Sequence, residues 1–160
     1  MVSAMSRPDP LALGVLLRQA HTRAASVLET ALSPLPVGPR HFGVLLHLSR
    51  LGESTQKELL SLTGSDKAGM ARTIDALVAA GFVTRQESTA DRRVNRLTLT
   101  AEGAAITADA LARARAAGQE MFGGFSAAEL AQLIGLLQRF VASEDAVGGH
   151  AAESAHVASG

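Results

Sequence analysis

The stretch from Thr55 to Thr100 constrains the fold of this chain more than any other part of the sequence. Its first half contains two short segments in which apolar residues recur at helical spacing, with a glycine-containing turn between them. Two strand-like runs follow, Phe82–Glu87 and Val94–Thr100, and a charged loop joins them. Two helices followed by a hairpin are the layout of a winged helix-turn-helix. We therefore expect a mainly α fold with a small antiparallel β wing.

Local signals mark where the two short helices begin and end. Thr55 and Glu58 form a capping-box pattern, in which each side chain satisfies a backbone amide that the helix start leaves unpaired. Ser65 is a favourable N-cap for the second helix, and Asp66 suits its first turn. Gly81 is the expected glycine at the C-terminal end of this helix.

Amphipathic helical patterns flank this stretch on both sides. The sequence predicts a disordered N-terminus (1–9), a dimerisation helix (10–34), a winged helix-turn-helix region (35–100), dimerisation helices (101–143) and a disordered tail (144–160). Thr100 is the expected cap of the first C-terminal helix, and Ser126 with Glu129 forms a second capping box. The flanking helices carry more apolar surface than a small winged domain can cover, so we expect a second copy of the chain to bury it. A monomer that folds these helices onto itself is the alternative.

The composition excludes several classes of site. The chain has no Cys, so it contains no disulfide, thiolate metal site or thiol-based redox sensor. It has no run of about 18 uncharged apolar residues and no apolar signal-peptide core, so we expect a cytoplasmic protein that does not enter a membrane. There is no nucleophile elbow, phosphate-binding glycine loop or pair of acids around a cleft pattern. The sequence therefore predicts no catalytic residue, no cofactor and no enzyme activity.

The net charge of the chain is zero, and the distribution of charge is more informative than its sum. Residues 55–100 contain seven basic and five acidic groups, whereas residues 101–160 contain three basic and seven acidic groups. The acidity therefore lies in the C-terminal third. Charge neither supports nor excludes nucleic-acid binding by the central stretch.

The second short helix presents small and basic residues on the face opposite to its apolar stripe. Small residues on that face permit a close approach to the edge of a base pair. Arg72 can make a bidentate contact to guanine or a phosphate contact, and Lys67 can reach a phosphate. The candidate DNA-binding residues of this helix are Lys67, Ala68, Gly69, Arg72 and Thr73. An ordinary surface helix is the alternative.

The loop between the two strand-like runs is the second candidate for DNA contact. Arg92 and Arg93 lie at its tip, and the negative potential of a minor groove attracts guanidinium groups. Asp91 can fix the rotamer of one of these arginines through a charge-assisted hydrogen bond. Arg85 and Arg96 on the strands would add positive charge to the same projection. A solvated turn with mixed charges is the alternative.

Two runs of residues resemble signatures of the MarR-type (multiple antibiotic resistance regulator) transcription factors. Asp91–Arg93 followed by Leu97–Gly103 is similar to that family's passage from the wing into a helix. Asp66–Ile74 followed by Ala80–Val83 resembles its recognition helix and the exit into the wing. The resemblance extends over about residues 10–143. It implies a homodimer whose two winged domains read a pseudo-palindromic operator in double-stranded DNA.

The resemblance also implies a small anionic or phenolic effector, bound between the dimerisation and DNA-binding regions. The residues that could line such a ligand-binding site here are Arg18, His21, His41 and His47. A lone histidine at a helix interface is more often structural, which is the alternative. His41 and His47 are six positions apart, not the three or four that place two ligands on one helical face, so we expect no metal site.

One departure from the family concerns the recognition helix. Related helices often carry hydroxyl residues where this chain has Ala68 and Gly69. Their absence removes hydrogen-bonding groups that could read bases, and it gives more weight to the wing arginines. Gly69 also costs roughly 1 kcal/mol of helix propensity relative to Ala. A close approach to DNA, or tight packing of a neighbouring helix, would explain its presence.

Together these features predict a sequence-specific DNA-binding transcriptional regulator that acts as a ligand-responsive homodimeric repressor. The competing interpretation is a winged-helix module that binds protein and not DNA. The zero net charge and the small-residue helix face favour this second interpretation slightly. Salt separates the two, because only a DNA reader loses affinity steeply as the salt concentration rises.

Overall fold

The computed structural model describes residues 9–63, 66–87 and 95–142. The predicted disordered tail, and the predicted disordered N-terminus up to residue 8, lie outside the described residues. The chain forms two compact units, Met1–Glu120 and Met121–Gly160, and each is described by itself. Among the described helices, none is both long enough and apolar enough to span a membrane.

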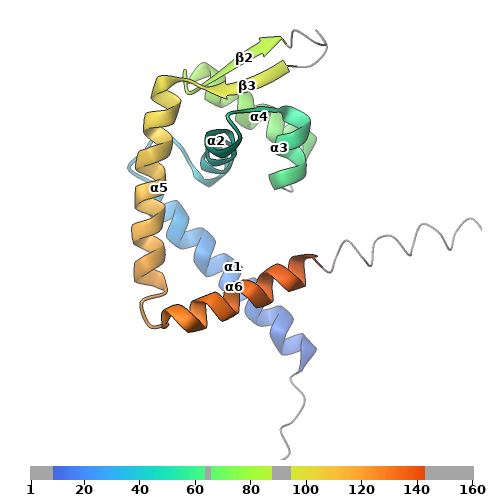
Figure 1. The fold of residues 1–160 in the computed structure, drawn as a ribbon, viewed down its shortest axis with the longest axis vertical. Helices are drawn as coiled ribbons and strands as arrows, with labels where there is room; N and C mark the ends of the chain where they lie inside the picture. The colour runs from blue at the N-terminus through green and yellow to red at the C-terminus, as the bar shows by residue number, and fades with distance from the viewer. Residues whose placement is uncertain (1–8, 64–65, 88–94, 143–160) are drawn as a thin grey trace, which may run out of the picture. The chain divides into compact units, whose positions relative to one another are not determined.

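The first unit contains seven helical and strand elements of the predicted type and one strand that was not predicted (Figure 1). In chain order they are α1 (Pro10–Leu32), α2 (Pro39–Leu51), β1 (Glu53–Thr55), α3 (Gln56–Thr63), α4 (Lys67–Ala79), β2 (Val83–Glu87), β3 (Asn95–Leu99) and α5 (Ala101–Met121). The helices predominate and the sheet is small and antiparallel. The expected fold class, a mainly α winged helix-turn-helix, is therefore confirmed.

The sheet has three strands in the order β1-β3-β2. The hairpin pairs Val83 with Leu99 and Glu87 with Asn95, as the two strand-like runs predicted. The strand β1 was missed, because three residues are too short to show an alternating pattern. It pairs antiparallel with the other edge of β3, with Ser54 opposite Leu97.

The hydrophobic core of the winged region lies between the helices α2, α3 and α4 and the sheet. Its buried side chains are Val37, Val44, Leu45, Leu48, Leu59, Met70, Ile74, Leu77, Val83 and Leu97. Burying a side chain of this size contributes roughly 1.5–3 kcal/mol relative to leaving it in water. This core therefore fixes the backbone from which α4 and the hairpin project.

A second, smaller cluster joins α5 to the helices before the winged region. Leu32 at the end of α1, Phe42 of α2 and Ala110 of α5 are buried together. Leu46 and Leu111 are partly buried against them. The first unit therefore holds α5 at a point well beyond its first turn.

Most of the helix ends are capped by the residues that the sequence predicted. Glu58 Oε2 accepts from the backbone N–H of Thr55 at 2.7 Å, and the Glu58 N–H donates to Thr55 Oγ1 at 3.2 Å, so the capping box is confirmed. The expected N-cap of α4 was wrong by one residue. Asp66, not Ser65, is the cap, and its carboxylate accepts from the N–H of Gly69 at 2.7 Å. An ionised carboxylate at this position also interacts favourably with the positive end of the helix dipole.

The second unit contains α6 (Ala127–Ala142). The predicted capping box at its start is confirmed, because Glu129 Oε2 accepts from the N–H of Ser126 at 2.8 Å and Ser126 Oγ accepts from the N–H of Glu129 at 3.3 Å. Just before it, the rings of Phe122 and Phe125 meet edge to face with 6.3 Å between their centroids. No side chain of α6 is buried. Its apolar residues are therefore not part of a core within the described chain.

Candidate nucleic-acid interface

The helix α4 turns one face to the core and presents the opposite face to solvent. The buried side chains are Met70, Ile74 and Leu77. Of the five residues predicted to read DNA, Lys67, Ala68 and Arg72 are exposed. Gly69 and Thr73 are half-buried. The exposed part of this face thus combines the small Ala68 with the cations Lys67 and Arg72. Such a surface can approach the edge of a base pair and contact a phosphate at the same time.

The N-cap explains Gly69 in a way that the sequence did not suggest. A Cβ atom at Gly69 would lie 2.8 Å from Oδ2 of Asp66, whose carboxylate folds back over the first turn. The Gly69 N–H is the main reason that the pKa of Asp66 lies below its ordinary value of 3.8, and the positive charge of Arg72 lowers it further. Gly69 therefore leaves room for the cap, and Asp66 is a structural anion beside the predicted DNA-reading cation.

Thr73 lies at the edge of the predicted DNA-facing surface. Its hydroxyl donates to the carbonyl oxygen of Gly69 at 2.9 Å. Its side chain also lines a hollow of about 350 Å³ between α2 and α4. The residues around this hollow are Pro39, Arg40, Gly43, Val44, His47, Met70 and Thr73. Thr73 therefore faces the side of α4 that lies next to α2, and its hydroxyl is already hydrogen-bonded.

Both arginines on the wing strands form ion pairs. Arg85 Nη2 lies 2.7 Å from Asp75 Oδ1 on α4, and Arg96 Nη1 lies 2.8 Å from Glu53 Oε1 on β1. Such exposed pairs contribute roughly 0–1 kcal/mol each. They connect the hairpin to α4 and to β1, and their charges are largely compensated. The added positive charge expected from these two strand residues is therefore reduced.

Asp91, Arg92 and Arg93 lie outside the described residues. The strand β2 ends at Glu87, and β3 begins at Asn95. The contact of these three residues with DNA stays a prediction.

The four residues predicted to bind a ligand do not gather at one site, since Arg18 and His21 lie on α1 whereas His41 and His47 lie on α2. Arg18 borders a shallow hollow formed by α1 residues alone, and His21 is exposed on the same helix. His41 Nδ1 accepts from the N–H of Gly38 at 3.2 Å, so this side chain caps the start of α2. His47 borders the hollow between α2 and α4. His41 and His47 diverge because six positions on a helix correspond to about 240° of rotation.

Acidic and histidine side chains do not gather into a metal-binding group of three or more anywhere in the described part of the chain.

Comparison with known proteins shows which family this chain resembles. A sequence model of the MarR family matches residues 35–94. The structure of a mutant MarR from E. coli complexed with operator DNA is 29% identical, with a TM-score of 0.75 over 81% of this chain and 93% of that one. A MarR-family regulator from Rhodococcus sp. RHA1 is 26% identical, with a TM-score of 0.77 over 84% of this chain and 96% of that one. The chain is therefore similar to MarR-type winged-helix proteins, both in the sequence of its winged region and in its fold.

A further similar structure is that of BpsR from Bordetella bronchiseptica, whose DNA binding is regulated by 6-hydroxynicotinic acid. It is 27% identical, with a TM-score of 0.73 over 81% of this chain and 98% of that one. Proteins of the family are transcription regulators. One of the matched proteins was solved in complex with operator DNA.

Three features of the site were not found from the sequence. The first is Asp66 as the cap of α4, which a run of two good N-cap residues left ambiguous. The second is the hollow lined by both Arg40 and His47, which depends on how α2 packs against α4. The third is Lys57, which is exposed in the first turn of α3. In a helix-turn-helix the first helix crosses the DNA backbone, so a cation there is a candidate phosphate contact.

Proposed function

We propose that this MarR-type regulator is a sequence-specific, homodimeric repressor whose DNA binding responds to a small ligand. The observation that carries the proposal is the likeness to a relative that was solved on operator DNA, over 93% of that relative's length. The exposed Lys67, Ala68 and Arg72 face of α4 supports the same function, because the core holds this helix from behind.

Within the proposed interface, Arg72 and Lys67 make the main contacts in the major groove. Ala68 and Gly69 allow α4 to come close to the base edges, and Thr73 has a lesser part because its hydroxyl is already bonded within the helix. Arg92 and Arg93 enter the adjacent minor groove, with Asp91 as their local partner. The wing would thus supply contacts that the small residues of α4 cannot make.

Selection of bound sequences from random duplexes tests DNA reading and dimerisation together. We expect a consensus with two-fold symmetry, and an affinity that falls steeply as the salt concentration rises. A chain that recovers no symmetric consensus and shows no salt dependence would instead be a winged-helix module for protein binding. A reporter gene placed behind the selected operator then separates repression from activation.

The wing is tested by replacing Arg92 and Arg93 together with Ala. The slope of log affinity against log salt should become shallower by about 2, since each phosphate or groove contact by a cation contributes about 1. Arg115→Ala, at an exposed position of α5, is the matched control and should leave the slope unchanged. A double variant with the slope of the wild type would remove the wing from the interface.

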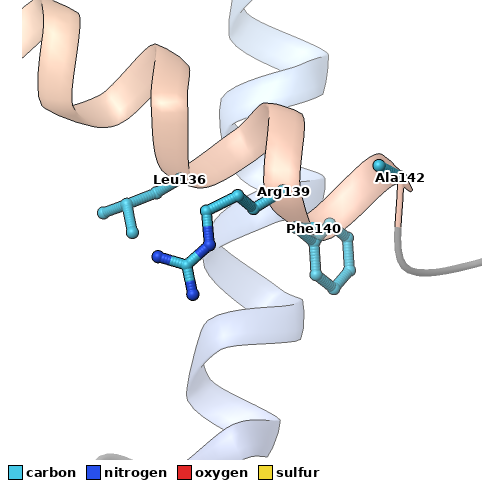
Figure 2. A pocket seen from close by; sticks show the side chains of 4 residues that line it. All are labelled: Leu136, Arg139, Phe140 and Ala142. Atoms are coloured by element: carbon cyan, nitrogen blue, oxygen red, sulfur yellow. The ribbon is translucent and has the colours of Figure 1, made fainter.

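Exposed apolar side chains support the proposed homodimer. In α1, Leu11 is 80% exposed and Leu16 is 59% exposed. In α6, Leu136 is 52% exposed, and Figure 2 shows it with Arg139, Phe140 and Ala142 around a surface hollow. Apolar residues on helices of this length are normally covered, and a second copy supplies a self-complementary surface. Sedimentation equilibrium should give a dimer at micromolar concentration, and a monomer throughout would contradict the proposal.

For the ligand response, we place the effector in the hollow between α2 and α4. Among the four predicted ligand residues, His47 is the one that borders a hollow touching the recognition helix, and Arg40 adds a cationic group there. Val44 and Met70 give the hollow apolar walls, so a small aromatic carboxylate fits its chemistry. A ligand there would change the operator affinity of α4 because it contacts that helix directly.

Titration calorimetry with benzoate as the probe tests this placement. We expect Arg40→Ala and His47→Ala to weaken benzoate binding, while Arg18→Ala and His21→Ala on α1 leave it unchanged. The opposite pattern would move the effector site to α1. Benzoate should also lower operator affinity in the wild type but not in the His47→Ala variant.

A further inference from the structure

We propose that Thr100 and Gly103 are positioning residues, which fix the angle between the recognition helix α4 and the helix α5. The joint is formed by two short segments that are far apart in sequence, Gly81–Phe82 after α4 and Thr100–Gly103 at the start of α5. In Figure 1, α5 starts beside the base of the hairpin, directly after β3. The consequence for operator spacing rests on the proposed function, whereas the joint itself does not.

The first half of the joint is the end of α4. Gly81 has a φ of +76°, and its N–H donates to the Val78 carbonyl at 3.0 Å. The Phe82 N–H donates to the Leu77 carbonyl at 3.0 Å. These two bonds form a Schellman motif, which closes a helix in one defined geometry. The carbonyl groups of Gly81 and Phe82 therefore have a fixed orientation relative to α4.

The second half is the start of α5, and Thr100 binds both carbonyl groups. The Thr100 N–H donates to the Phe82 carbonyl at 3.1 Å, and Thr100 Oγ1 donates to the Gly81 carbonyl at 2.7 Å. The same Oγ1 accepts from the N–H of Gly103 at 2.9 Å. One hydroxyl thus caps α5 and binds the end of α4 at once. Loss of this hydroxyl would therefore remove a bond between the end of α4 and the start of α5, in addition to the cap of α5.

Gly103 allows the two segments to come into contact. A Cβ atom at this position would lie 1.9 Å from the Phe82 carbonyl oxygen and 2.8 Å from its carbonyl carbon. Ordinary contact needs about 3.4 Å, so any side chain would push the backbone segments apart by about 1.5 Å. The clash is with main-chain atoms that cannot rotate away. Gly103 is therefore required by the distance between α5 and the turn after α4.

Side-chain packing holds the first half of α5 at the angle that the joint sets. Ile106 is partly buried against the winged core, and Ala110 is fully buried against Phe42 of α2. The winged region and the first half of α5 consequently move as one piece. If α5 contributes to the dimer as proposed, Thr100 and Gly103 set the separation and tilt of the two recognition helices. They would then determine which spacing of operator half-sites is bound.

The joint can be measured without DNA, because the chain has no cysteine. Spin labels are attached to cysteines introduced at the exposed Ala76 of α4 and Ala112 of α5. The full-length labelled protein is diluted with unlabelled protein, so that pulsed EPR measures the distance between the two labels of one chain. Gly103→Ala should shift the mean distance by about 1.5 Å or more, the opening that the clash requires. Gly118→Ala adds the same methyl group to α5 where nothing lies within 4 Å, and should not shift it.

A second pair of variants keeps the test decisive if Gly103→Ala fails to fold. Thr100→Val removes the hydroxyl without adding bulk and should broaden the distance distribution. Thr100→Ser keeps the hydroxyl and should restore the narrow distribution. Distributions for Gly103→Ala or Thr100→Val that coincide with that of the wild type would overturn the proposal.

The functional consequence is measured with operators whose half-sites are moved apart or together by one base pair. The wild type should prefer one spacing, and the preference should fall by roughly 2- to 30-fold in Thr100→Val, the range expected when a coupling network is perturbed. An equal loss of affinity at every spacing would show a merely structural role and overturn this part. Absence of operator binding by the wild type would instead refute the proposed function, and the EPR result would still decide the joint.

Discussion

The helices α4 and α6 show that similar sequence patterns can be buried in different ways. Both are amphipathic, with 13 residues in α4 and 16 in α6. In α4, Met70, Ile74 and Leu77 are at most 2% exposed. In α6 the corresponding stripe is open, with Ile134 at 55%. The apolar side of α4 is buried within the chain, so its polar side faces solvent and can make the proposed DNA contacts. The apolar side of α6 is exposed, and the proposed second copy of the chain would cover it.

The largest expected effect comes from truncating the same residue type in the two helices. Ile74→Ala should lower the free energy of unfolding by about 2–5 kcal/mol, because it removes a side chain from a packed core. Ile134→Ala should change it by less than about 0.5 kcal/mol when the protein is dilute enough to be monomeric. Urea denaturation at low concentration measures both. Equal losses would mean that α6 is buried within its own chain.

The next comparison uses the cations of the two helices. Arg72→Ala should weaken operator binding by about 1–3 kcal/mol, the expected value for a bidentate contact to a base. Arg139→Ala on α6 is the control and should leave operator affinity unchanged at protein concentrations that keep the chain dimeric. A fluorescence anisotropy titration at fixed salt concentration measures both variants. A larger loss of operator affinity for Arg139→Ala than for Arg72→Ala would show that α4 is not the helix that binds DNA.

A smaller effect is expected for association of two chains. Leu136→Ala should weaken the dimer by about 1–2 kcal/mol, or roughly 5- to 30-fold in Kd, if this side chain is covered by the partner. Gln138→Ala, two positions along the same helix, is the matched control. Sedimentation equilibrium gives both constants. The dimer interface would lie elsewhere if the two variants matched the wild type.

The smallest expected effect concerns pH and the two helix caps. The Gly69 N–H lowers the pKa of Asp66, and the Ser126 N–H is the main group that lowers the pKa of Glu129. A carboxylate with a lowered pKa in the folded state stabilises the fold above its unfolded pKa, and this stability is lost as the pH falls through the folded pKa. Wild-type stability should therefore decline below about pH 4.

Neutral variants of the caps test this dependence. Asp66→Asn should flatten the decline in global stability, because α4 belongs to the core. Glu129→Gln should alter only the helix content of α6 as the pH is lowered. Urea unfolding and circular dichroism across the acid range separate the two effects. An unchanged acid profile for Asp66→Asn would show that the cap contributes nothing to the stability of α4.

Features that depend on near neighbours in the chain were predictable from the sequence. The capping boxes at Thr55 and Ser126, the cap at Thr100 and the terminal glycine Gly81 all lie within a few residues of their partners. Residue types alone therefore located most helix ends and gave the correct fold class. The choice between Ser65 and Asp66 failed because both are good caps and only the start of the helix distinguishes them.

Features that depend on distant contacts were not predictable. The ion pairs of Arg85 and Arg96 require the position of the sheet beside α4 and β1. The hollow beside His47 depends on how α2 packs against α4. The clash that makes Gly103 necessary involves a carbonyl group 21 positions earlier in the chain. No periodicity or motif in one sequence contains this information.

The short strand β1 has a consequence for how the winged region opens. It lies before α3 in the chain and pairs with β3, which lies after α4. Both helices of the helix-turn-helix are therefore enclosed in a loop that the sheet closes. Neither can unfold from a free end, so the slowly exchanging amides of α3, α4 and β3 should exchange with deuterium in a single cooperative event. The three residues Glu53–Thr55 should thus make α3, α4 and the sheet one folding unit.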